Sequence, residues 1–600
     1  MFKLTKFIKG KALIFTIIGV LCVMGAAYLD SSQPTFLNDA ITSFSSAGTN
    51  DFWWGTHWHI TSMTGNSIYA FWPAILMMSI YAIGSLILGL SGSFLGSAAA
   101  LFSAMNTRQG MYSKVNTYSF YEVDKFSTAS LITRMSNDVQ RNQMCLQMIL
   151  TFLFRSPVTI IVSIVNSFTP PMGNTTYGCI IIAIVIVMLT VVAAIGFKVL
   201  PIFTKAQNKL DATNKVMREN ILGARVIKTF NIQNEQHARY EEQNKDLKKL
   251  NIRGQALLLP IMSVIMFILN ASIVIILIVA GLQFRYSSSH PQINAGIFAF
   301  TQLIAIVLFN TLNAIMVIVM ATRTEASAKR INAVLDTDPK IKDPINPKAL
   351  NNNYTVKFKN VDFKYNDKAQ VNTLEKIDFE IDSGKTLGIV GGTGSGKSTI
   401  ANLIPRFYEV NSGAIEIGGT NIKDVTQTEL CDKVCLVPQD ALLFSGTIES
   451  NLKFGKKDAN ERDMQQACDD ACAWDFVSKM KNKLQSHVEQ RGRNFSGGQK
   501  QRLSLARTLI KHPKILILDD TTSALDLLTE AKVQENLQKN YKDCTKIIIS
   551  QRISSVKNAD KILVLDAGKI VDSGTHQQLV KTSMLYRDIV QSQLGKEGME

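Results

Sequence analysis

At 600 residues the chain is too long for one hydrophobic core, so we expect two or more domains. Charged residues make up 19% of the sequence, and none lies between Asp51 and Arg108, which excludes a soluble domain for this part of the chain. The formal net charge of +16 could indicate a nucleic-acid partner. The basic residues gather beside apolar segments instead, where anionic lipid and the positive-inside bias explain them, so no nucleic acid is expected.

The first half of the chain contains about six stretches that are long and apolar enough to cross a hydrocarbon core of about 30 Å. They lie near residues 12–29, 67–95, 149–168, 178–200, 256–282 and 293–321. The first stretch follows several lysines and could pass for a signal peptide. Further apolar stretches follow it and no clear small-residue cleavage site is present, so we expect a retained membrane helix.

The loops between these spans predict how the chain crosses the membrane. Residues 30–67 and 169–177 contain no Lys or Arg, whereas residues 108–141 and 205–253 form long, polar and basic segments. Because basic loops remain on the cytoplasmic side, we expect these two segments and both termini in the cytoplasm. Their helical periodicity predicts that the membrane helices extend well beyond the bilayer.

The spans carry almost no ionisable side chains. Arg155 and Lys198 lie near the predicted cytoplasmic edge, where long side chains reach the interface. A carrier driven by protons or ions usually keeps acidic groups at membrane depth, so that mechanism is disfavoured. Amide side chains inside the spans either line a substrate cavity or hydrogen-bond between helices. These amides are Asn270, Gln302, Asn310 and Asn313.

Two features could indicate metal sites. His57 and His59 lie in a tryptophan-rich segment, but an interfacial aromatic belt explains that segment better than a metal does. Two C-x₃-C pairs have the wrong spacing for zinc and no histidine nearby, so buried thiols are expected instead. The pairs are Cys431 with Cys435 and Cys468 with Cys472.

After residue 321 the composition becomes that of a soluble domain, and residues 336–353 are rich in Pro, Asn and Lys, as in a linker. Beyond them, short β-rich runs alternate with amphipathic helical segments. The predicted fold class is an α-helical membrane domain, with about six transmembrane helices and long cytoplasmic extensions, followed by an α/β P-loop nucleotide-binding domain. We expect the membrane domain at residues 1–325, the linker at 326–352 and the nucleotide-binding domain at 353–600.

The apolar strand predicted at residues 386–390 runs into a glycine-rich loop that satisfies G-x₄-G-K-[ST]. Glycine amides can curl around phosphate oxygens, and the helix expected after the loop presents its positive end to them. Lys397 is expected to reach the β- and γ-phosphates of a nucleotide, and Ser398 to coordinate Mg²⁺. The loop consists of Gly391, Gly392, Thr393, Gly394, Ser395, Gly396, Lys397, Ser398 and Thr399.

A second apolar run, residues 514–518, predicts a buried strand that ends in Asp519 and Asp520. A carboxylate at such a strand end can hold Mg²⁺ through water opposite the phosphate loop, so Asp519 is an expected metal ligand. Many nucleoside triphosphatases contain this loop and strand pair. Alone, it predicts only a nucleoside triphosphate and Mg²⁺ as ligands.

Between these two elements, residues 494–502 read NFSGGQKQR. This segment resembles the LSGGQ signature of ATP-binding-cassette proteins, with Phe495 in place of the leading leucine. Ser496 and the amides that follow it offer an anion site at a helix start, suited to a γ-phosphate. The resemblance implies that the ATP-binding signature residues are Ser496, Gly497, Gly498 and Gln499.

Other positions match the same family in order. Tyr365 resembles the aromatic residue that stacks on adenine, and Gln439 resembles the glutamine that senses Mg²⁺ and contacts the membrane domain. Residues 523–526 (SALD) resemble the loop that crosses the dimer interface. Upstream, segments within 126–139 and 219–230 resemble the two cytoplasmic loops of exporters, so the likeness covers nearly the whole chain.

The resemblance implies a half-transporter that functions as a dimer. In this family two cassettes pair head to tail, and each ATP is clamped between one subunit's phosphate loop and the other's signature. Asp520 stands where the family normally has its catalytic glutamate, and Gln551 stands where it has a histidine. The aspartate is shorter by one methylene, and the glutamine cannot titrate near neutral pH or carry a positive charge.

Both departures concern one ATP, while the signature that serves the other ATP is intact. This pattern resembles the degenerate-site subunit of heterodimeric bacterial exporters. A positioned general base contributes about 10²–10⁴ in rate, so we expect this chain's own site, with Asp520 and Gln551, to bind ATP and hydrolyse it slowly. The expected partner is a second half-transporter subunit. The alternative is tolerated drift, with Asp520 still acting as the base.

The predicted function is an ATPase coupled to export across the cell membrane of a bacterium. Because the spans are poor in charge, the expected cargo is a hydrophobic or amphipathic, drug- or lipid-like compound. A peptide exporter and an ATP-gated regulatory, non-pumping membrane protein remain as alternatives.

Overall fold

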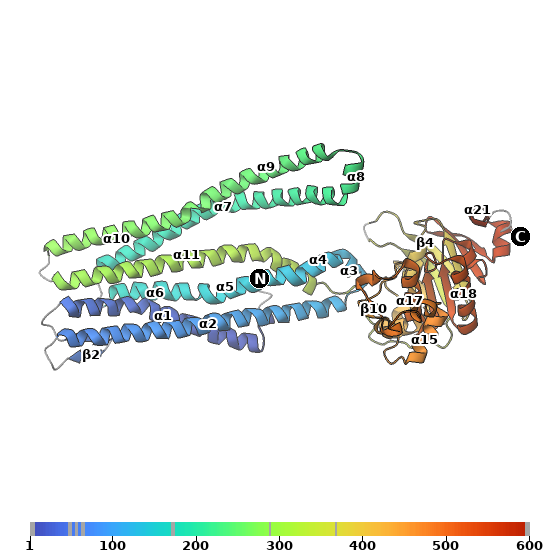
Figure 1. Ribbon diagram of the computed structural model, residues 1–600, viewed down its shortest axis with the longest axis horizontal. Coiled ribbons are helices and arrows are strands. Elements are labelled where there is room, and N and C mark those ends of the chain that lie inside the picture. Colours follow the sequence, from blue (N-terminus) through green and yellow to red (C-terminus); the bar gives the residue numbers. More distant parts are fainter. Residues whose placement is uncertain are drawn as a thin grey trace. The chain divides into compact units, whose positions relative to one another are not determined.

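The computed structural model describes residues 6–45, 51–54, 58–61, 67–169, 175–286, 290–366 and 369–594. The chain forms two compact units, a helical unit and an α/β unit (Figure 1). The helical unit comprises Met1–Asn116 and Ala129–Asp336, and the α/β unit comprises Thr117–Thr128 and Thr337–Glu600. This division into an apolar helical part and an α/β part confirms the predicted fold class.

Helices make up nearly all of the described part of the helical unit, and several of them are long. They are α1 (Lys11–Ser45), α2 (Ser67–Asn116), α4 (Thr128–Thr133), α5 (Val139–Met148), α6 (Arg155–Phe168), α7 (Thr175–Leu222), α8 (Ala224–Thr229), α9 (Gln233–Leu258), α10 (Pro260–Tyr286) and α11 (His290–Leu335). Two π-helical turns, η2 (Arg134–Asp138) and η3 (Ile149–Leu153), connect α4, α5 and α6 into one nearly unbroken run. β1 (Asp51–Trp54) and β2 (Trp58–Thr61) pair as an antiparallel hairpin, and His57 lies outside the described residues.

The length of these helices agrees with the predicted extensions. The 50 residues of α2 reach about 75 Å at 1.5 Å per residue, more than twice the thickness of a hydrocarbon core. Within the described residues, five stretches are long and apolar enough to cross a membrane, and the apolar part of α7, Thr175–Val191, is shorter. The five stretches are Lys11–Ile41, Trp72–Asn116, Thr128–Phe168, Gln233–Leu282 and Gly296–Leu335. A count of six spans therefore stays a prediction.

The first helix does not end where the sequence predicted. We expected a loop to begin at Asp30, but α1 continues to Ser45. Asp30 lies inside α1 and forms an ion pair with Arg155 at the start of α6, and the Ser85 hydroxyl of α2 donates to the same carboxylate. Arg155 is therefore the partner of a partly buried acid rather than a lone side chain reaching the interface. Because side chains from two other helices satisfy the carboxylate, α1 can pass through Asp30 without a break.

Polar contacts also join α11 to the run that contains η2. The buried Asp138 carboxylate accepts a hydrogen bond from Arg330 Nε at 2.7 Å and from Ser327 Oγ at 2.9 Å. Asn310, one of the amides predicted to line a cavity or to link helices, donates instead to the Ile306 carbonyl of its own helix at 2.9 Å. α11 continues to Leu335, so the first part of the expected linker is helical.

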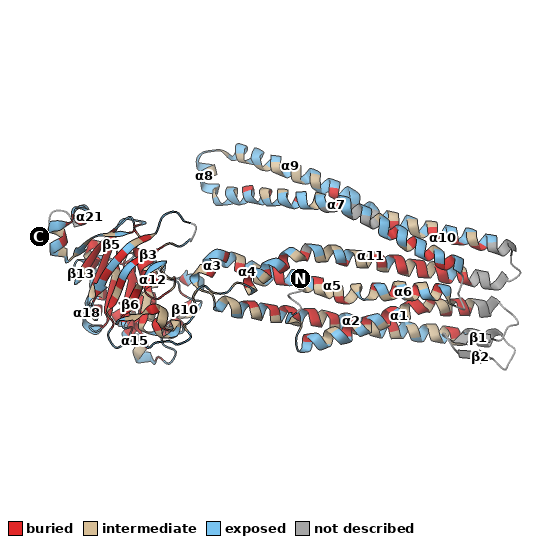
Figure 2. Ribbon diagram, turned by 180° about the vertical axis from the view of Figure 1, so that it is seen from behind, coloured by how far each residue is buried: buried red, intermediate tan, exposed pale blue. Residues whose placement is uncertain are grey.

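Two sheets form the centre of the α/β unit (Figure 2). The six-stranded sheet has the order β14-β13-β5-β12-β11-β8, in which only the β13–β14 pair is antiparallel. Its strands are β5 (Thr386–Gly391), β8 (Val434–Val437), β11 (Ile515–Asp519), β12 (Thr545–Ile549), β13 (Lys561–Asp566) and β14 (Lys569–Gly574). The antiparallel sheet contains β3 (Val356–Phe363), β4 (Leu374–Ile381), β6 (Ser412–Ile417) and β7 (Thr420–Asn421). A short pair joins β9 (Gly446–Thr447) and β10 (His487–Val488).

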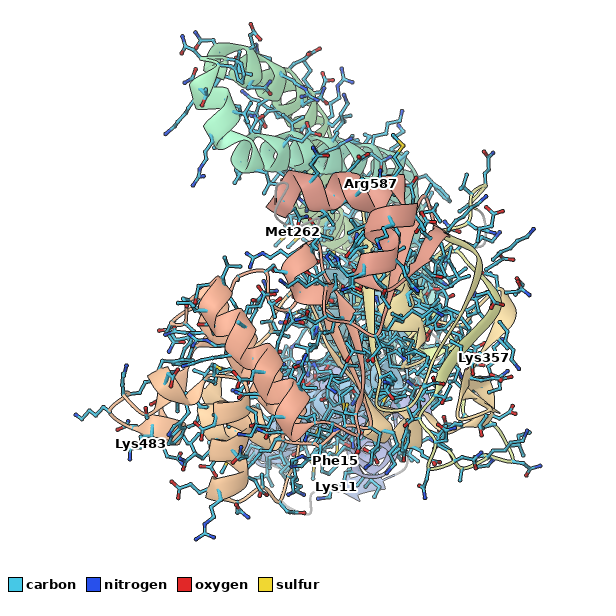
Figure 3. The ribbon with its side chains drawn as sticks, turned by 90° about the vertical axis from the view of Figure 1, so that its right-hand side faces the viewer. Lys11, Phe15, Met262, Lys357, Lys483 and Arg587 are labelled. Carbon is cyan, nitrogen blue, oxygen red and sulfur yellow. The ribbon has the colours of Figure 1, made fainter. Side chains whose placement is uncertain are left out.

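Helices surround these sheets. They are α3 (Phe120–Phe126), α12 (Lys397–Leu403), α13 (Gln427–Lys433), α14 (Ile448–Lys453), α15 (Glu461–Asp470), α16 (Trp474–Val477), α17 (Gly497–Leu509), α18 (Leu527–Asn540), α19 (Ile553–Val556), α20 (His576–Thr582) and α21 (Met584–Leu594). Every residue of β11 is buried, as expected for a parallel strand covered on both faces. Charged side chains such as Lys483 and Arg587 lie on the exposed surface (Figure 3).

The cysteine pairs of this unit belong to its packing. Cys468 and Cys472 are buried in the core beneath α17, and Cys431 and Cys435 are half-buried. Burial raises the pKa of Cys468 to about 12 and that of Cys435 to about 11, so both remain protonated thiols at neutral pH.

Candidate nucleotide site

The candidate site lies where four parallel strands of the large sheet end. β5 leads into the glycine-rich loop, β11 ends at Asp519, and β12 is followed by Ser550 and Gln551. β8 is followed two residues later by Gln439. Because the strands are parallel and in register, with Asp519 opposite Ile549, their carboxyl ends converge at one edge of the sheet. Ligands of open α/β sheets bind at this edge.

A cavity of about 340 Å³ opens at these strand ends. This volume lies within the usual range for small-molecule sites. It is lined by Thr373, Thr393, Gly394, Gly396, Lys397, Ser398, Thr399, Gln439, Asp519, Asp520, Ile549, Ser550 and Gln551. The structure thus brings most of the predicted phosphate-loop, metal and catalytic residues together around one space.

The glycine-rich loop has the backbone geometry that only glycine adopts easily. Gly394 and Gly396 have φ values of +81° and +98°. A Cβ atom on Gly396 would lie 2.5 Å from Leu374 Cδ2, so the loop also depends on the missing side chain. Lys397 Nζ donates to the carbonyls of Gly391 at 3.0 Å and Gly392 at 2.7 Å, which holds the ammonium beside the loop. Burial lowers the pKa of Lys397, and the carboxylates of Asp519 and Asp520 oppose that effect.

The residues predicted to hold Mg²⁺ offer a suitable set of donors. Ser398 Oγ donates to Asp519 Oδ1 at 3.0 Å, so the hydroxyl and the carboxylate lie next to each other. Burial raises the pKa of Asp519, while the hydrogen bond from Ser398 lowers it. Gln439 lines the same cavity with an amide group. Hydroxyl, carboxylate and amide oxygens are the hard ligands that Mg²⁺ prefers, so these residues fit the ion.

Asp520 is held in a strained conformation directly after Asp519. Its φ is +48°, a left-handed value that is uncommon for a residue with a side chain. The backbone amide of Asp520 donates to the Ile549 carbonyl at 2.8 Å. Its carboxylate accepts one hydrogen bond from Gln439 Nε2 at 3.3 Å and another from the backbone amide of Gln551. Burial raises its pKa, and the hydrogen bond from Gln551 is the main opposing effect. The backbone therefore aims this carboxylate into the cavity.

The loop that carries Gln551 is fixed by the last described helix. Gln593 of α21 donates through Nε2 to the Gln551 carbonyl at 2.7 Å, and its Oε1 accepts from the Ile553 amide at 2.9 Å. One side-chain amide thus bridges the backbone on both sides of Arg552. No local pattern in the sequence indicates this contact, because the two segments lie some forty residues apart.

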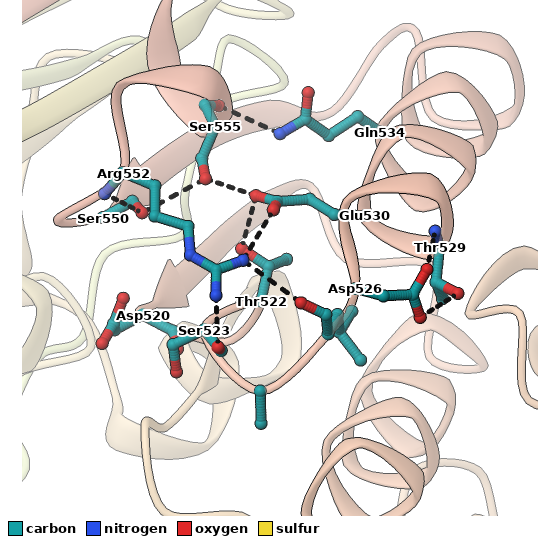
Figure 4. Close-up of polar contacts among 12 residues, drawn as sticks. Asp520, Thr522, Ser523, Asp526, Thr529, Glu530, Gln534, Ser550, Arg552 and Ser555 are labelled. Atoms are coloured by element: carbon teal, nitrogen blue, oxygen red, sulfur yellow. Dashed lines mark hydrogen bonds and ion pairs between the residues drawn. The ribbon is translucent and has the colours of Figure 1, made fainter. Parts of the chain in front are cut away.

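A buried polar network joins the same loop to residues 523–526 (Figure 4). The Glu530 carboxylate is 3% exposed and accepts hydrogen bonds from Thr522, Ser555 and Arg552.

Arg552 also donates to the carbonyls of Ser523 at 2.8 Å and Leu525 at 3.2 Å. The guanidinium therefore ties the loop after β12 to the segment predicted to cross a dimer interface. Sequence reasoning missed Glu530, because an acid in the first turn of a helix usually marks an exposed charge.

The signature residues lie away from the cavity described above. Ser496 caps α17, where its hydroxyl accepts from the Gln499 amide at 3.3 Å and its own amide donates to Gln499 Oε1 at 3.0 Å. None of Ser496, Gly497, Gly498 and Gln499 is among the residues that line the cavity. Phe495, the departure from the usual leucine, is buried and keeps an apolar anchor at that position.

Tyr365, the residue predicted to face adenine, lies beside the glycine-rich loop. Its side chain is 41% exposed, and its hydroxyl donates to Thr399 Oγ1 at 3.2 Å. Its ring packs edge-to-face against Phe363 at a centroid distance of 4.8 Å. The tyrosine therefore presents an aromatic surface to solvent next to the cavity.

Comparison with known proteins gives consistent findings for both units. Residues 374–523 match the ABC transporter family, and residues 16–312 match the ABC transporter transmembrane region. The chain is 34% identical to an uncharacterized ABC transporter ATP-binding protein, YfiB, of Bacillus subtilis (strain 168), over 85% of this chain and 88% of that protein. It is also 34% identical to a putative ABC transporter ATP-binding protein, MG014, of Mycoplasma genitalium, over 85% of this chain and 84% of the relative.

A solved structure, that of a bacterial Atm1-family ABC exporter with ATP bound, superposes with a TM-score of 0.77. The match covers 96% of this chain and 97% of the other at 24% sequence identity. At that identity the likeness concerns the fold alone.

Proposed function

The chain belongs to the ABC transporter family, as an exporter half-transporter with its membrane and ATPase domains on one polypeptide, and from this premise we propose that it is the slowly hydrolysing subunit of a heterodimer. The ATPase domain drives transport. The proposed cargo is a hydrophobic or amphipathic compound, exported across the cell membrane, with both termini and the ATPase domain in the cytoplasm.

One observation supports the proposal most strongly. Asp520 and Gln551 line the same cavity as Lys397, while the signature residues Ser496–Gln499 do not. In a head-to-tail dimer, the two departures from the family pattern therefore belong to this chain's own ATP. The intact signature belongs to the ATP held by the partner.

The residues of the cavity suggest how ATP is held. In this proposal Lys397 and the amides of the glycine-rich loop contact the β- and γ-phosphates, and Tyr365 stacks on the adenine. The position of Lys397 in the cavity lining and the hydrogen bond of Tyr365 to Thr399 support these roles. Ser398, Asp519 and Gln439 would hold Mg²⁺, which when bound neutralises the charge that develops on the phosphates. ATP binding favours the closed pair of cassettes, and this shifts the membrane domains toward the outward-open state.

The same geometry accounts for slow hydrolysis. The attacking water must be positioned by a carboxylate, and Asp520 is shorter than glutamate by one methylene. Its carboxylate is also engaged by Gln439 and by the Gln551 amide. Gln551 can donate a hydrogen bond to phosphate, but it brings no positive charge to the developing transition state.

The cargo class follows from the helical unit. Its described spans are strongly apolar, and Asp30, one of the two acids in the span Lys11–Ile41, forms an ion pair with Arg155. Accumulation of a fluorescent lipophilic dye in inside-out vesicles tests this part of the proposal. Uptake that requires hydrolysable ATP and the partner subunit supports it, and uptake of a peptide in place of the dye contradicts it.

The double variant Asp520→Glu/Gln551→His tests the catalytic assignment. We expect it to raise hydrolysis at this chain's site by about 10²-fold, because a base at the correct distance and a cation are restored. The measurement is ATPase activity of the heterodimer in nanodiscs, with the partner's catalytic glutamate changed to glutamine so that only this chain's site contributes.

Asp566→Glu, a change of the same kind on the exposed surface, is the matched control and leaves the rate unchanged. No rise in the double variant, with ATP still bound, contradicts the assignment of Asp520 and Gln551.

A further inference from the structure

A series of aromatic rings in the α/β unit connects Tyr365 to α3, the short helix contributed by residues 120–126. Tyr408 lies at its centre and is 8% exposed. Its ring centroid is 5.0 Å from that of Tyr365 and 5.0 Å from that of Tyr121, with interplanar angles of 87° and 81°. Tyr408 is therefore edge-to-face with a ring on the cavity side and with a ring on α3.

Each end of this series is fixed by a hydrogen bond. At the cavity end, the Tyr365 hydroxyl donates to Thr399 of the glycine-rich loop. On the side of α3, the hydroxyl of the central ring, Tyr408, donates to Asp124 Oδ2 at 2.6 Å, and Phe120 packs on the neighbouring Phe407 at 4.7 Å. Only Tyr365 in this group both borders the cavity residues and exposes a large part of its ring.

Aromatic pairs prefer an edge-to-face or an offset-stacked arrangement, so each of these contacts favours one relative orientation of its two rings. A base that stacks on the exposed face of Tyr365 restricts that ring to one orientation. Because the rings of Tyr365 and Tyr408 are in contact, a fixed orientation of Tyr365 also restricts the orientation of Tyr408. Tyr408 in turn contacts Asp124 and Tyr121, so the restriction reaches α3. Lys397 and several residues of the glycine-rich loop line the cavity, whereas none of these rings does. A phosphate group held by Lys397 and the loop amides would therefore not touch the rings.

We propose that Tyr408 is a positioning residue that holds Tyr365 for the base and transmits the presence of the base, as distinct from the phosphates, to α3. This inference rests on the proposed function in one respect, namely that the base is the adenine of ATP. It adds a route by which the protein distinguishes a complete nucleotide from a polyphosphate.

The test compares MgATP with magnesium tripolyphosphate on the full-length protein in nanodiscs. Affinities are measured for each ligand, and hydrogen exchange of residues 117–128 is followed by mass spectrometry. In the unmodified protein we expect ATP, and not tripolyphosphate, to protect the α3 amides. Tyr408→Leu is expected to weaken ATP binding by about 3- to 10-fold, the value of one aromatic pair, with tripolyphosphate affinity changed by less than about twofold.

Tyr408→Phe separates the two parts of the proposal. It keeps the ring and loses the bond to Asp124, so ATP affinity is retained while the ATP-dependent protection of α3 falls. Tyr586→Phe is the matched control, because Tyr586 is another buried tyrosine whose hydroxyl contacts a side chain, His576, at 2.8 Å in the same unit. It is expected to change neither measurement.

The outcomes that overturn the proposal are distinct. If Tyr408→Leu weakens ATP and tripolyphosphate equally, Tyr408 has a general structural role and the inference is wrong. If α3 responds equally to both ligands in the unmodified protein, the route does not carry information about the base. A protein that binds tripolyphosphate but gains nothing from adenine overturns the assignment of Tyr365 as well, whereas failure to bind either ligand overturns the proposed function.

Discussion

At the scale of single residues, Arg552 forms several polar contacts that its place in the sequence beside Gln551 does not predict. Its guanidinium meets the Glu530 carboxylate at 3.2 Å and two carbonyls of the 523–526 segment. Glu530 is almost completely buried, so these partners offset the cost of removing its carboxylate from water. The position of the predicted interface loop is therefore set by an ion pair inside the unit.

Removing the cation while leaving the buried acid should be strongly destabilising. We expect Arg552→Leu to destabilise the α/β unit by about 3 kcal/mol, which corresponds to a fall of roughly 6–12 °C in apparent Tm. Glu530→Gln should cost less, because Arg552 is partly exposed and remains hydrated. Thermal unfolding of the purified protein measures both changes.

Lys569→Ala serves as the comparison, because Lys569 forms an exposed ion pair with Glu375 at 3.2 Å. This variant should leave the unfolding transition unchanged. If Arg552→Leu shifts the transition no more than Lys569→Ala does, the network does not hold the loop.

The site residues differ in how far the sequence predicts them. The nine residues of the glycine-rich loop are contiguous and follow one strand, so local spacing suffices to place them. Asp519 and Asp520 were predicted from the end of a buried strand, and the structure places both at the cavity. The left-handed backbone of Asp520 and its bond to Gln439 depend on how β8 and β11 pair, and no local pattern contains that information.

At the scale of elements, α1 and α2 approach closely at glycines. A Cβ atom on Gly92 of α2 would lie 2.7 Å from Val23 Cγ2 and 3.0 Å from the Val23 backbone nitrogen of α1. A Cβ on Gly19 of α1 would lie 3.2 Å from the backbone nitrogen of Gly96. Small residues allow helices in a membrane to pack by direct backbone contact.

The close approach predicts unequal costs for the same substitution on one helix. Gly92→Ala should separate α1 from α2 and destabilise the helical unit by about 1–3 kcal/mol. Gly89→Ala, one turn away, should be tolerated, because its Cβ would lie 3.9 Å from Ala26 Cβ. The rate of thermal aggregation in detergent compares the two. Equal behaviour of both variants contradicts the described packing.

The end of α1 shows where element prediction from sequence fails. Hydropathy placed the end of the first span at residue 29, because the next residue is an acid. The helix continues because Asp30 pairs with Arg155, which lies 125 residues later in the chain. A hydropathy pattern contains no information about such a distant partner. The strands β5 and β11, in contrast, follow from their own apolar runs.

At the scale of the whole molecule, the division into a helical and an α/β unit was predictable from the change in composition after residue 321. α3 is the exception, since residues 117–128 lie between membrane helices in sequence but pack with the α/β unit. The aromatic contacts of Phe120 and Tyr121 explain this assignment. A pattern of spans and loops could not predict which unit those rings would pack against.

On the proposed function, this chain binds ATP in its own site but depends on a different partner subunit for rapid hydrolysis. The most direct test is ATPase activity in nanodiscs, for the chain alone and for the chain co-expressed with a partner half-transporter. We predict that the chain alone is nearly inactive, and that activity appears with the partner and is lost when the partner's catalytic glutamate is changed to glutamine. Vigorous hydrolysis by the chain alone, abolished by Asp520→Asn, would show a homodimer with two competent sites and contradict the account.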